Sequence, residues 1–140
     1  MITVIRAEER LRRLSERDGR RRVDIITDEL LGITAVQADI VYNDAGVIGS
    51  PHQHTDADHV FMVIRGSGIQ YTDDAAEQVG PGDVYFIPRG DFHWFHNTGD
   101  ETSERLEIWI PAPTETIWRD PDDSCAFVPD GHGVLDRDLS

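Results

Sequence analysis

Short apolar runs separated by turn residues fill most of this chain and limit the folds open to it. After Arg22, runs such as HVFMVIRGSG and RLEIWIPAP are rich in β-branched and aromatic residues, and Gly, Asp, Asn or Pro interrupts them every eight to twelve residues. This spacing is typical of short strands in a sandwich or barrel. In HVFMVI both faces are apolar, which predicts a strand buried on both sides. The sequence therefore predicts an all-β domain.

The N-terminal segment differs in charge from the rest of the chain. All thirteen basic residues are arginines, and eight of them lie in residues 1–22 beside four acidic residues, so this arm carries about +4 and the remainder about −18. Leucines at positions 11 and 14 and acids near the start predict one short helix over residues 7–17. We interpret the arm as a solvated amphipathic helix. Docking on an acidic surface, such as that of a dimer partner, is the alternative.

The length and the charge pattern predict one folded domain behind this arm. A chain of 140 residues is long enough to bury a core. We divide it into the basic arm with its short helix, residues 1–22, and a β domain, residues 23–140, whose last part, residues 111–140, is irregular and acidic. Trp118 and Phe127 are expected to hold parts of this tail against the body.

The composition also excludes several classes of function. A net charge of −14 disfavours nucleic acid as a partner, because phosphates would be repelled. No stretch is long and apolar enough for a membrane span, and the N-terminus does not resemble a secretory signal. The single cysteine, Cys125, cannot form a disulfide within the chain, so we expect a cytoplasmic protein.

Histidines are concentrated in one place: three of the six lie in the nine residues PHQHTDADH. His52 and His54 share a face if this segment is extended, His59 opens the next apolar strand, and His93 follows a turn at PRG. A pair two residues apart, a third after a turn and a fourth from a neighbouring strand can converge on one metal. On spacing alone, buried structural histidines and a chance cluster on a polar loop are alternatives.

The residues around these histidines resemble the two motifs of the cupin family, G-x5-H-x-H-x(3,4)-E-x6-G and G-x5-P-x-G-x2-H-x3-N. Nine of the ten fixed positions hold the expected residue: Gly46, His52, His54, Gly66, Gly82, Pro88, Gly90, His93 and Asn97. The flanking strands extend the resemblance over roughly residues 30–110. It implies a double-stranded β-helix, that is a jelly-roll barrel, usually a homodimer, with a metal inside the barrel mouth.

The resemblance implies His52, His54 and His93 as metal ligands, and the position of the usual glutamate is His59. We favour a site of four histidines; a three-histidine site and the absence of a metal are the alternatives. Neutral imidazoles would leave a divalent ion with about +2 rather than +1, which favours an anionic oxygen donor as substrate. Imidazoles suit zinc, iron, nickel and copper, so we predict one divalent transition metal per chain.

An aromatic and aliphatic pocket is expected around this metal, although core packing is the alternative for most of its candidate residues. These are Tyr42, Phe61, Val63, Gln70, Tyr85, Phe95 and Trp109. The resemblance implies an enzyme acting on a small oxygenated molecule such as an enolate, a diketone or an aromatic polyketide. The metal would be a Lewis acid for cyclisation or isomerisation, or the oxygen-activating centre of a dioxygenase. A non-catalytic binding or sensor cupin is the alternative.

Overall fold

Twelve strands and three short helices form the part of the chain that the structure describes. This computed structural model describes residues 1–135. None of its helices is long and apolar enough to cross a membrane, and the cytoplasmic location stays a prediction. The elements are η1 (Ala7–Glu9), β1 (Leu11–Ser15), β2 (Arg21–Ile26), α1 (Asp28–Leu31), β3 (Gln37–Asn43), β4 (His52–Gln53), β5 (Asp58–Arg65), β6 (Gly68–Thr72), β7 (Ala76–Val79), β8 (Val84–Ile87), β9 (His93–His96), β10 (Ser103–Ile110), β11 (Ile117–Trp118), η2 (Pro121–Asp123) and β12 (Phe127–His132).

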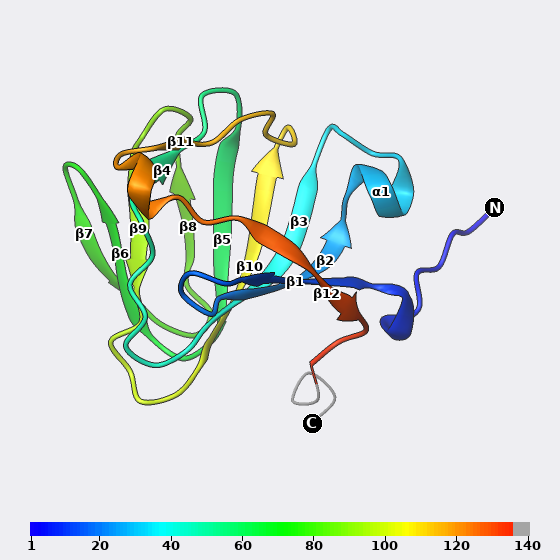
Figure 1. Ribbon diagram of the computed structural model, residues 1–140, viewed down its shortest axis with the longest axis horizontal. Coiled ribbons are helices and arrows are strands. Elements are labelled where there is room, and N and C mark those ends of the chain that lie inside the picture. The colour runs from blue at the N-terminus through cyan, green and yellow to red at the C-terminus, as the bar shows by residue number, and fades with distance from the viewer. Residues whose placement is uncertain (136–140) are drawn as a thin grey trace.

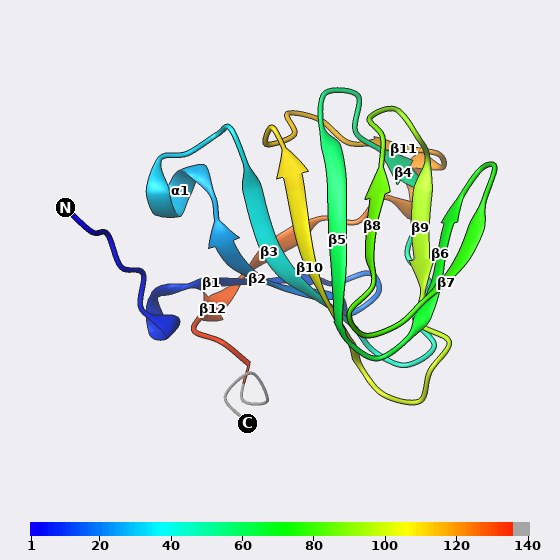
Figure 2. The same cartoon turned by 180° about the vertical axis from the view of Figure 1, so that it is seen from behind.

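The strands form two antiparallel sheets that roll toward each other around a shared interior (Figures 1 and 2). Sheet A has the strand order β12-β1-β2-β3-β10-β5-β8, and sheet B has the order β11-β4-β9-β6-β7. Strand β10 pairs with β3 on one side and with β5 on the other, so it is an interior strand of sheet A. The predicted all-β jelly-roll fold is confirmed.

The two faces of β5 differ in exposure, which the sequence did not predict. His59, Phe61 and Val63 are buried on the inner face. On the outer face, Met62 and Ile64 keep 37% and 43% of their surface exposed. The prediction of a strand buried on both sides is therefore wrong for the single chain, because none of the elements within residues 1–135 covers this outer face.

The helix predicted over residues 7–17 of the N-terminal arm is wrong beyond its first turn, because Leu11–Ser15 forms the strand β1. Only Ala7–Glu9 is helical, and β1 then pairs with β2 on one edge and with β12 on the other. Figure 1 shows β1 and β12 side by side, so the first and last strands of the described chain are neighbours in sheet A. Strand pairing satisfies the backbone of this segment, and Leu11 and Ser15 are buried by it.

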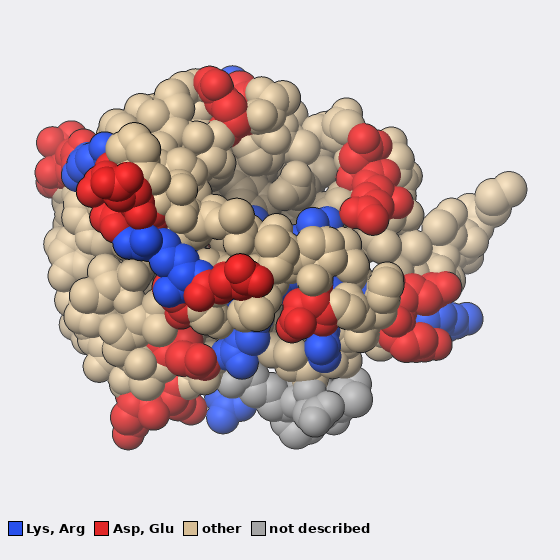
Figure 3. Space-filling model, viewed as in Figure 1, with Lys and Arg blue, Asp and Glu red and all other residues tan. Residues whose placement is uncertain are grey.

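The arginines of the arm pair with acids of the same chain. Arg13 lies 3.2 Å from Asp24, and Arg21 lies 2.6 Å from Asp44. Further ion pairs join Arg17 to Asp123 and Arg22 to Asp39 and Glu107. Figure 3, viewed as Figure 1, shows basic side chains in blue next to acidic side chains in red on the surface. The arm is thus not a solvated helix; it docks on the acidic body of its own chain.

The C-terminal tail is less irregular than predicted, because β11, η2 and β12 lie within it. The Trp118 ring lies 4.9 Å from the His52 ring, and the Arg22 guanidinium lies 3.8 Å above the Phe127 ring. Both aromatic residues therefore hold the tail against the body, as expected. Residues 136–140 of the predicted tail lie outside the described residues.

Gly68 on β6 lies where this strand and β9 approach each other closely. A Cβ atom at this position would lie 2.4 Å from the carbonyl oxygen of His96 and 2.4 Å from Cζ of Phe95. We expect Gly68→Ala to lower the free energy of unfolding by about 1–3 kcal/mol through overpacking, measured by urea denaturation. Gly80→Ala is the matched control, since a Cβ there meets nothing within 4 Å. Equal stabilities of the two variants would contradict this packing.

Candidate metal centre

Three histidines converge inside the barrel mouth, on the segments that the sequence singled out. His52 lies on β4 and is paired in register with His93 on β9, and His54 follows directly after β4. One ring nitrogen of each lies within 4.8 Å of those of the other two. Gly90, whose φ is +85°, turns the chain toward β9 and donates its N–H to the carbonyl of His54 at 2.7 Å. The turn therefore couples the two histidine segments.

Hydrogen bonds to backbone carbonyls fix the orientation of all three rings. Nδ1 of His52 lies 2.8 Å from the Ser50 carbonyl, Nδ1 of His54 lies 3.2 Å from that of Glu115, and Nδ1 of His93 lies 3.0 Å from that of Asp91. A carbonyl oxygen only accepts, so each Nδ1 carries the proton and each Nε2 presents a lone pair. Among the described residues, Nε2 of His54 and of His93 has no hydrogen-bond partner although it is buried. This is the arrangement of metal-ligating imidazoles with their supporting acceptors.

The surroundings keep these imidazoles neutral. Burial lowers the pKa of His52 well below its usual value, and the adjacent His93 lowers it further. Burial is also the largest cause that lowers the pKa of His54, and that of His93 to about 4. Only the neutral ring binds a metal, so the three histidines are ready to coordinate at neutral pH.

His59, the fourth predicted ligand, lies beside this group but outside the set of three. Its ring stacks on Trp109 at 4.6 Å, and its centroid lies 5.3 Å from that of His93. Its Nε2 lies 3.8 Å from Oε2 of Glu107, which is a carboxylate on the neighbouring strand β10. Burial, followed by the charge of His93, lowers the pKa of His59 well below its usual value. Coordination by His59 stays a prediction.

The inner face of β10 carries two charged residues that the sequence analysis missed. Arg105, Glu107 and Trp109 alternate along β10 and are buried, whereas Leu106 and Ile108 between them are only half-buried. The alternation in RLEIW could have revealed an inward charged face, but it runs against the usual preference for apolar residues inside.

Arg105 is held by neutral groups and aromatic rings. Its guanidinium donates to Tyr85 Oη at 3.0 Å and to Asn43 Oδ1 at 3.1 Å. It also lies 3.8 Å above the Phe95 ring and 4.8 Å from the Phe61 ring. These contacts fix a positive charge inside the barrel, near the histidines.

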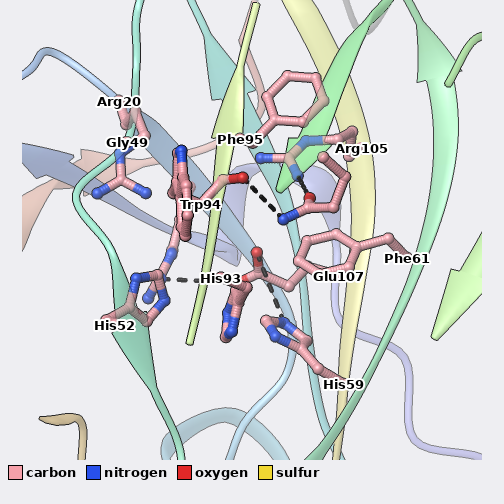
Figure 4. Close-up of a pocket in the computed structure, with 12 residues that line it drawn as sticks. Arg20, Gly49, His52, His59, Phe61, His93, Trp94, Phe95, Arg105 and Glu107 are labelled. Atoms are coloured by element: carbon pink, nitrogen blue, oxygen red, sulfur yellow. Dashed lines mark hydrogen bonds and ion pairs between the residues drawn. The ribbon is translucent and has the colours of Figure 1, made fainter. Parts of the chain in front are cut away.

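Two cavities adjoin the histidines, and Arg20, Arg22 and His52 line both. The inner cavity has about 20 Å³ of space and the outer cavity about 180 Å³. Figure 4 shows His52 and His59 on either side of His93, with Arg20 beside Gly49. The inner cavity is also lined by Gly49, His59, Phe61, Gln70, His93, Trp94, Phe95, Arg105 and Glu107, and the outer cavity by His54, Thr116, Trp118, Cys125 and Phe127.

The residues predicted for the substrate pocket fall into three groups. Phe61, Gln70 and Phe95 line the inner cavity. Tyr85 lies behind Gln70 and donates its hydroxyl to Oε1 of that side chain at 2.8 Å. The others do not line these two cavities: Trp109 stacks on His59, Val63 packs in the core with Val79 and Phe95, and Tyr42 is buried on β3.

Comparison with known proteins identifies relatives of this chain. The family described as "Cupin domain" matches residues 40–110. A curated protein of Aquifex aeolicus, described as uncharacterized, is 37% identical over 62 residues, which are 44% of this chain and 50% of that protein. The chain thus spans about half the length of the curated relative it matches.

Solved structures share the fold over most of the chain. A sugar phosphate isomerase of the cupin superfamily from Silicibacter pomeroyi has a TM-score of 0.71 at 22% identity, covering 96% of this chain and 98% of that one. The polyketide cyclase RemF from Streptomyces resistomycificus has a TM-score of 0.71 at 20% identity, covering 88% of this chain and 89% of that one. The structural likeness establishes the fold, and at identities this low it leaves the activity open.

The buried, neutral His93 predicts a pH-dependent stability in the metal-free protein. Because its folded pKa of about 4 lies below the unfolded value near 6.5, the unfolded chain binds more protons between these values, and stability falls as the pH drops through this range. We expect wild type to lose about 2 kcal/mol more than His93→Asn between pH 7 and pH 5. Urea denaturation with chelator present measures this. Equal losses would show that His93 is not buried in the neutral form.

Proposed function

The chain belongs to the cupin family, and we propose that it is a metal-dependent enzyme acting on a small, oxygenated organic anion. The observation that carries this proposal is the set of three histidines, two of them buried and one half-buried, each of which offers a ring nitrogen within 4.8 Å of the other two. A structural role does not account for buried nitrogens without partners, since each unsatisfied polar atom costs stability.

The residues fit a divalent transition metal, one per chain, held by His52, His54 and His93. Imidazole nitrogens suit zinc, iron, nickel or copper. His59 would complete the set. Its ring centroid lies 5.6 Å from that of His54, which is as close as the 5.8 Å between the ring centroids of His54 and His93. When bound, the metal would supply a Lewis acid for cyclisation or isomerisation, or a binding site for dioxygen in a dioxygenase.

The chain's own groups would position the substrate. Gln70, Phe61 and Phe95 line the inner cavity together with the charged residues Arg105 and Glu107, and its roughly 20 Å³ has room for one small group only. The body of the substrate would lie in the outer cavity of about 180 Å³. A divalent metal on neutral imidazoles would favour an enolate, diketonate or carboxylate over a neutral compound. Among the similar folds, an isomerase and a polyketide cyclase make the Lewis-acid branch the first to assay.

Elemental analysis of protein never exposed to chelator or nickel resin tests the metal. We expect about one transition-metal ion per chain in wild type, and a sharp loss in His93→Ala and in His59→Ala because each removes a proposed ligand. The exposed His132 provides the control variant His132→Ala, which should keep the metal.

The outcomes separate the alternatives. Full occupancy in His59→Ala with loss in His93→Ala would leave a three-histidine site. Absence of metal in wild type, even after each ion is added, would overturn the enzyme proposal and favour a binding role for the pocket.

We also propose that the protein is a homodimer joined through the outer face of sheet A. This face consists of the outward side chains of three adjacent strands: Val60, Met62, Ile64, Val84, Phe86, Leu106, Ile108 and Ile110. Phe86 is 58% exposed and Val84 is 65% exposed. An apolar patch of this extent marks an interface. A second copy fits it because a twofold axis pairs the same patch with itself, and because its residues are all apolar and bring no like charges together despite the net charge of −14.

Phe86→Asp tests this interface. Placing a charge in the patch should convert the dimer to a monomer, measured by size-exclusion chromatography with light scattering. Ile33→Asp is the control, because Ile33 is 42% exposed but lies outside sheet A. A monomeric wild type, or a Phe86→Asp protein that remains a dimer, would refute the proposed face.

A further inference from the structure

We propose that Arg20 and Arg22 form an oxyanion-binding subsite that takes a carboxylate or phosphate group of the substrate. Both arginines come from the N-terminal arm, outside the motifs around the histidines, and both line the two cavities that adjoin His52. The inference rests on the proposed function and extends it, because it assigns to the substrate a second anchoring point, distinct from the proposed metal ligands in the same cavity.

Arg20 is buried with donors that the chain leaves unused. The residue is only 6% exposed, and Asp18 accepts from its Nε at 2.7 Å and from its backbone N–H at 3.1 Å. Its Nη2 is buried, and no described residue accepts a hydrogen bond from it. Asp18 therefore fixes the plane of the guanidinium, while the far edge remains free for an acceptor. A carboxylate or phosphate is the acceptor that matches such an edge.

Arg22 is held by stacking more than by hydrogen bonds. Its guanidinium lies 3.8 Å above the Phe127 ring and 5.2 Å from the Trp109 ring. Its Nε lies 3.6 Å from Asp39 and its Nη2 lies 3.6 Å from Glu107, distances that exceed a direct hydrogen bond. The rings orient the guanidinium, and its buried Nε donates no hydrogen bond to any described residue.

The charge of the cavity lining favours an anion in the outer cavity. Glu107 lines the inner cavity, but the eight residues lining the outer cavity include two arginines and no acid. Thr116 adds a hydroxyl to this lining. An anion in the outer cavity thus meets positive charge without a facing carboxylate, in a partly buried place where the attraction is stronger than in water.

The position of the subsite defines the class of substrate. His52 and His54 line the same outer cavity as the arginines, so a compound bound there reaches the histidine cluster with its other end. About 180 Å³ is less than the roughly 300–1,000 Å³ of ordinary ligand pockets. The substrate is therefore a small carboxylate or phosphate ester that carries a second oxygen function.

Calorimetric titration of the metal-free protein with inorganic phosphate and, separately, with malonate tests the subsite. We expect at least one of these anions to bind, with about tenfold or greater loss of affinity in Arg20→Gln and in Arg22→Gln, because each removes charge-assisted hydrogen bonds. Arg20→Lys keeps the charge without the planar fork and should bind more weakly than wild type even where Arg20→Gln fails to fold. Arg65→Gln is the matched control, since exposed Arg65 pairs only with Glu101 among the described residues.

The two titrations show whether the subsite binds a phosphate or a carboxylate. Because chelator keeps the protein metal-free, the result does not depend on the metal. Phosphate binding alone supports a phosphate ester, and malonate binding alone supports a carboxylate. Binding of neither anion to wild type, or equal binding by wild type, Arg20→Lys and Arg22→Gln, overturns the subsite even if the protein holds a metal. Arginine-dependent binding in a protein that takes up no metal would support the subsite and refute the metalloenzyme.

Discussion

Buried charge on the inner face of sheet A is the constraint on which much of this structure depends. Removing an unpaired charge from water costs several kcal/mol, so charges in the barrel need neighbours of opposite sign or hydrogen-bond partners. Asp39 and Glu107 lie on adjacent strands, and β2 brings Arg22 to 3.6 Å from both. Burial and the nearby Glu107 raise the pKa of Asp39 well above its usual value. By pairing with the sheet, the basic arm thus places a positive charge, that of Arg22, beside these two buried acids.

Local signals explain why the barrel and its histidines could be predicted. Short apolar runs separated by turn glycines mark the strands between residues 37 and 110, and Gly90 lies at the turn that positions His93. His52 and His93 belong to motifs whose spacing reflects one strand pair, β4 with β9. Where a short stretch of sequence determines a contact, pattern and structure agree.

The strand of the N-terminal arm and the inward charges of β10 could not be predicted from local sequence in the same way. Leucines at 11 and 14 fit a helix locally, but β1 takes its partner from the other end of the chain, where Leu14 faces Val128. Tertiary pairing overrides local preference here. Arg105 and Glu107 occupy inward positions that are normally apolar, and only the surrounding network of Tyr85, Asn43 and Arg22 makes them tolerable inside.

The pairing of β1 with β12 also has a consequence for the outer cavity. The outer cavity takes Arg20 and Arg22 from one end of the chain and Phe127 from the other, whereas the histidines come from its middle. Closing so long a loop costs chain entropy, which the contacts of β12 must offset. A chain that lacks β12 would hold all three histidine segments but lack Phe127, so its outer cavity would be open to solvent on that side.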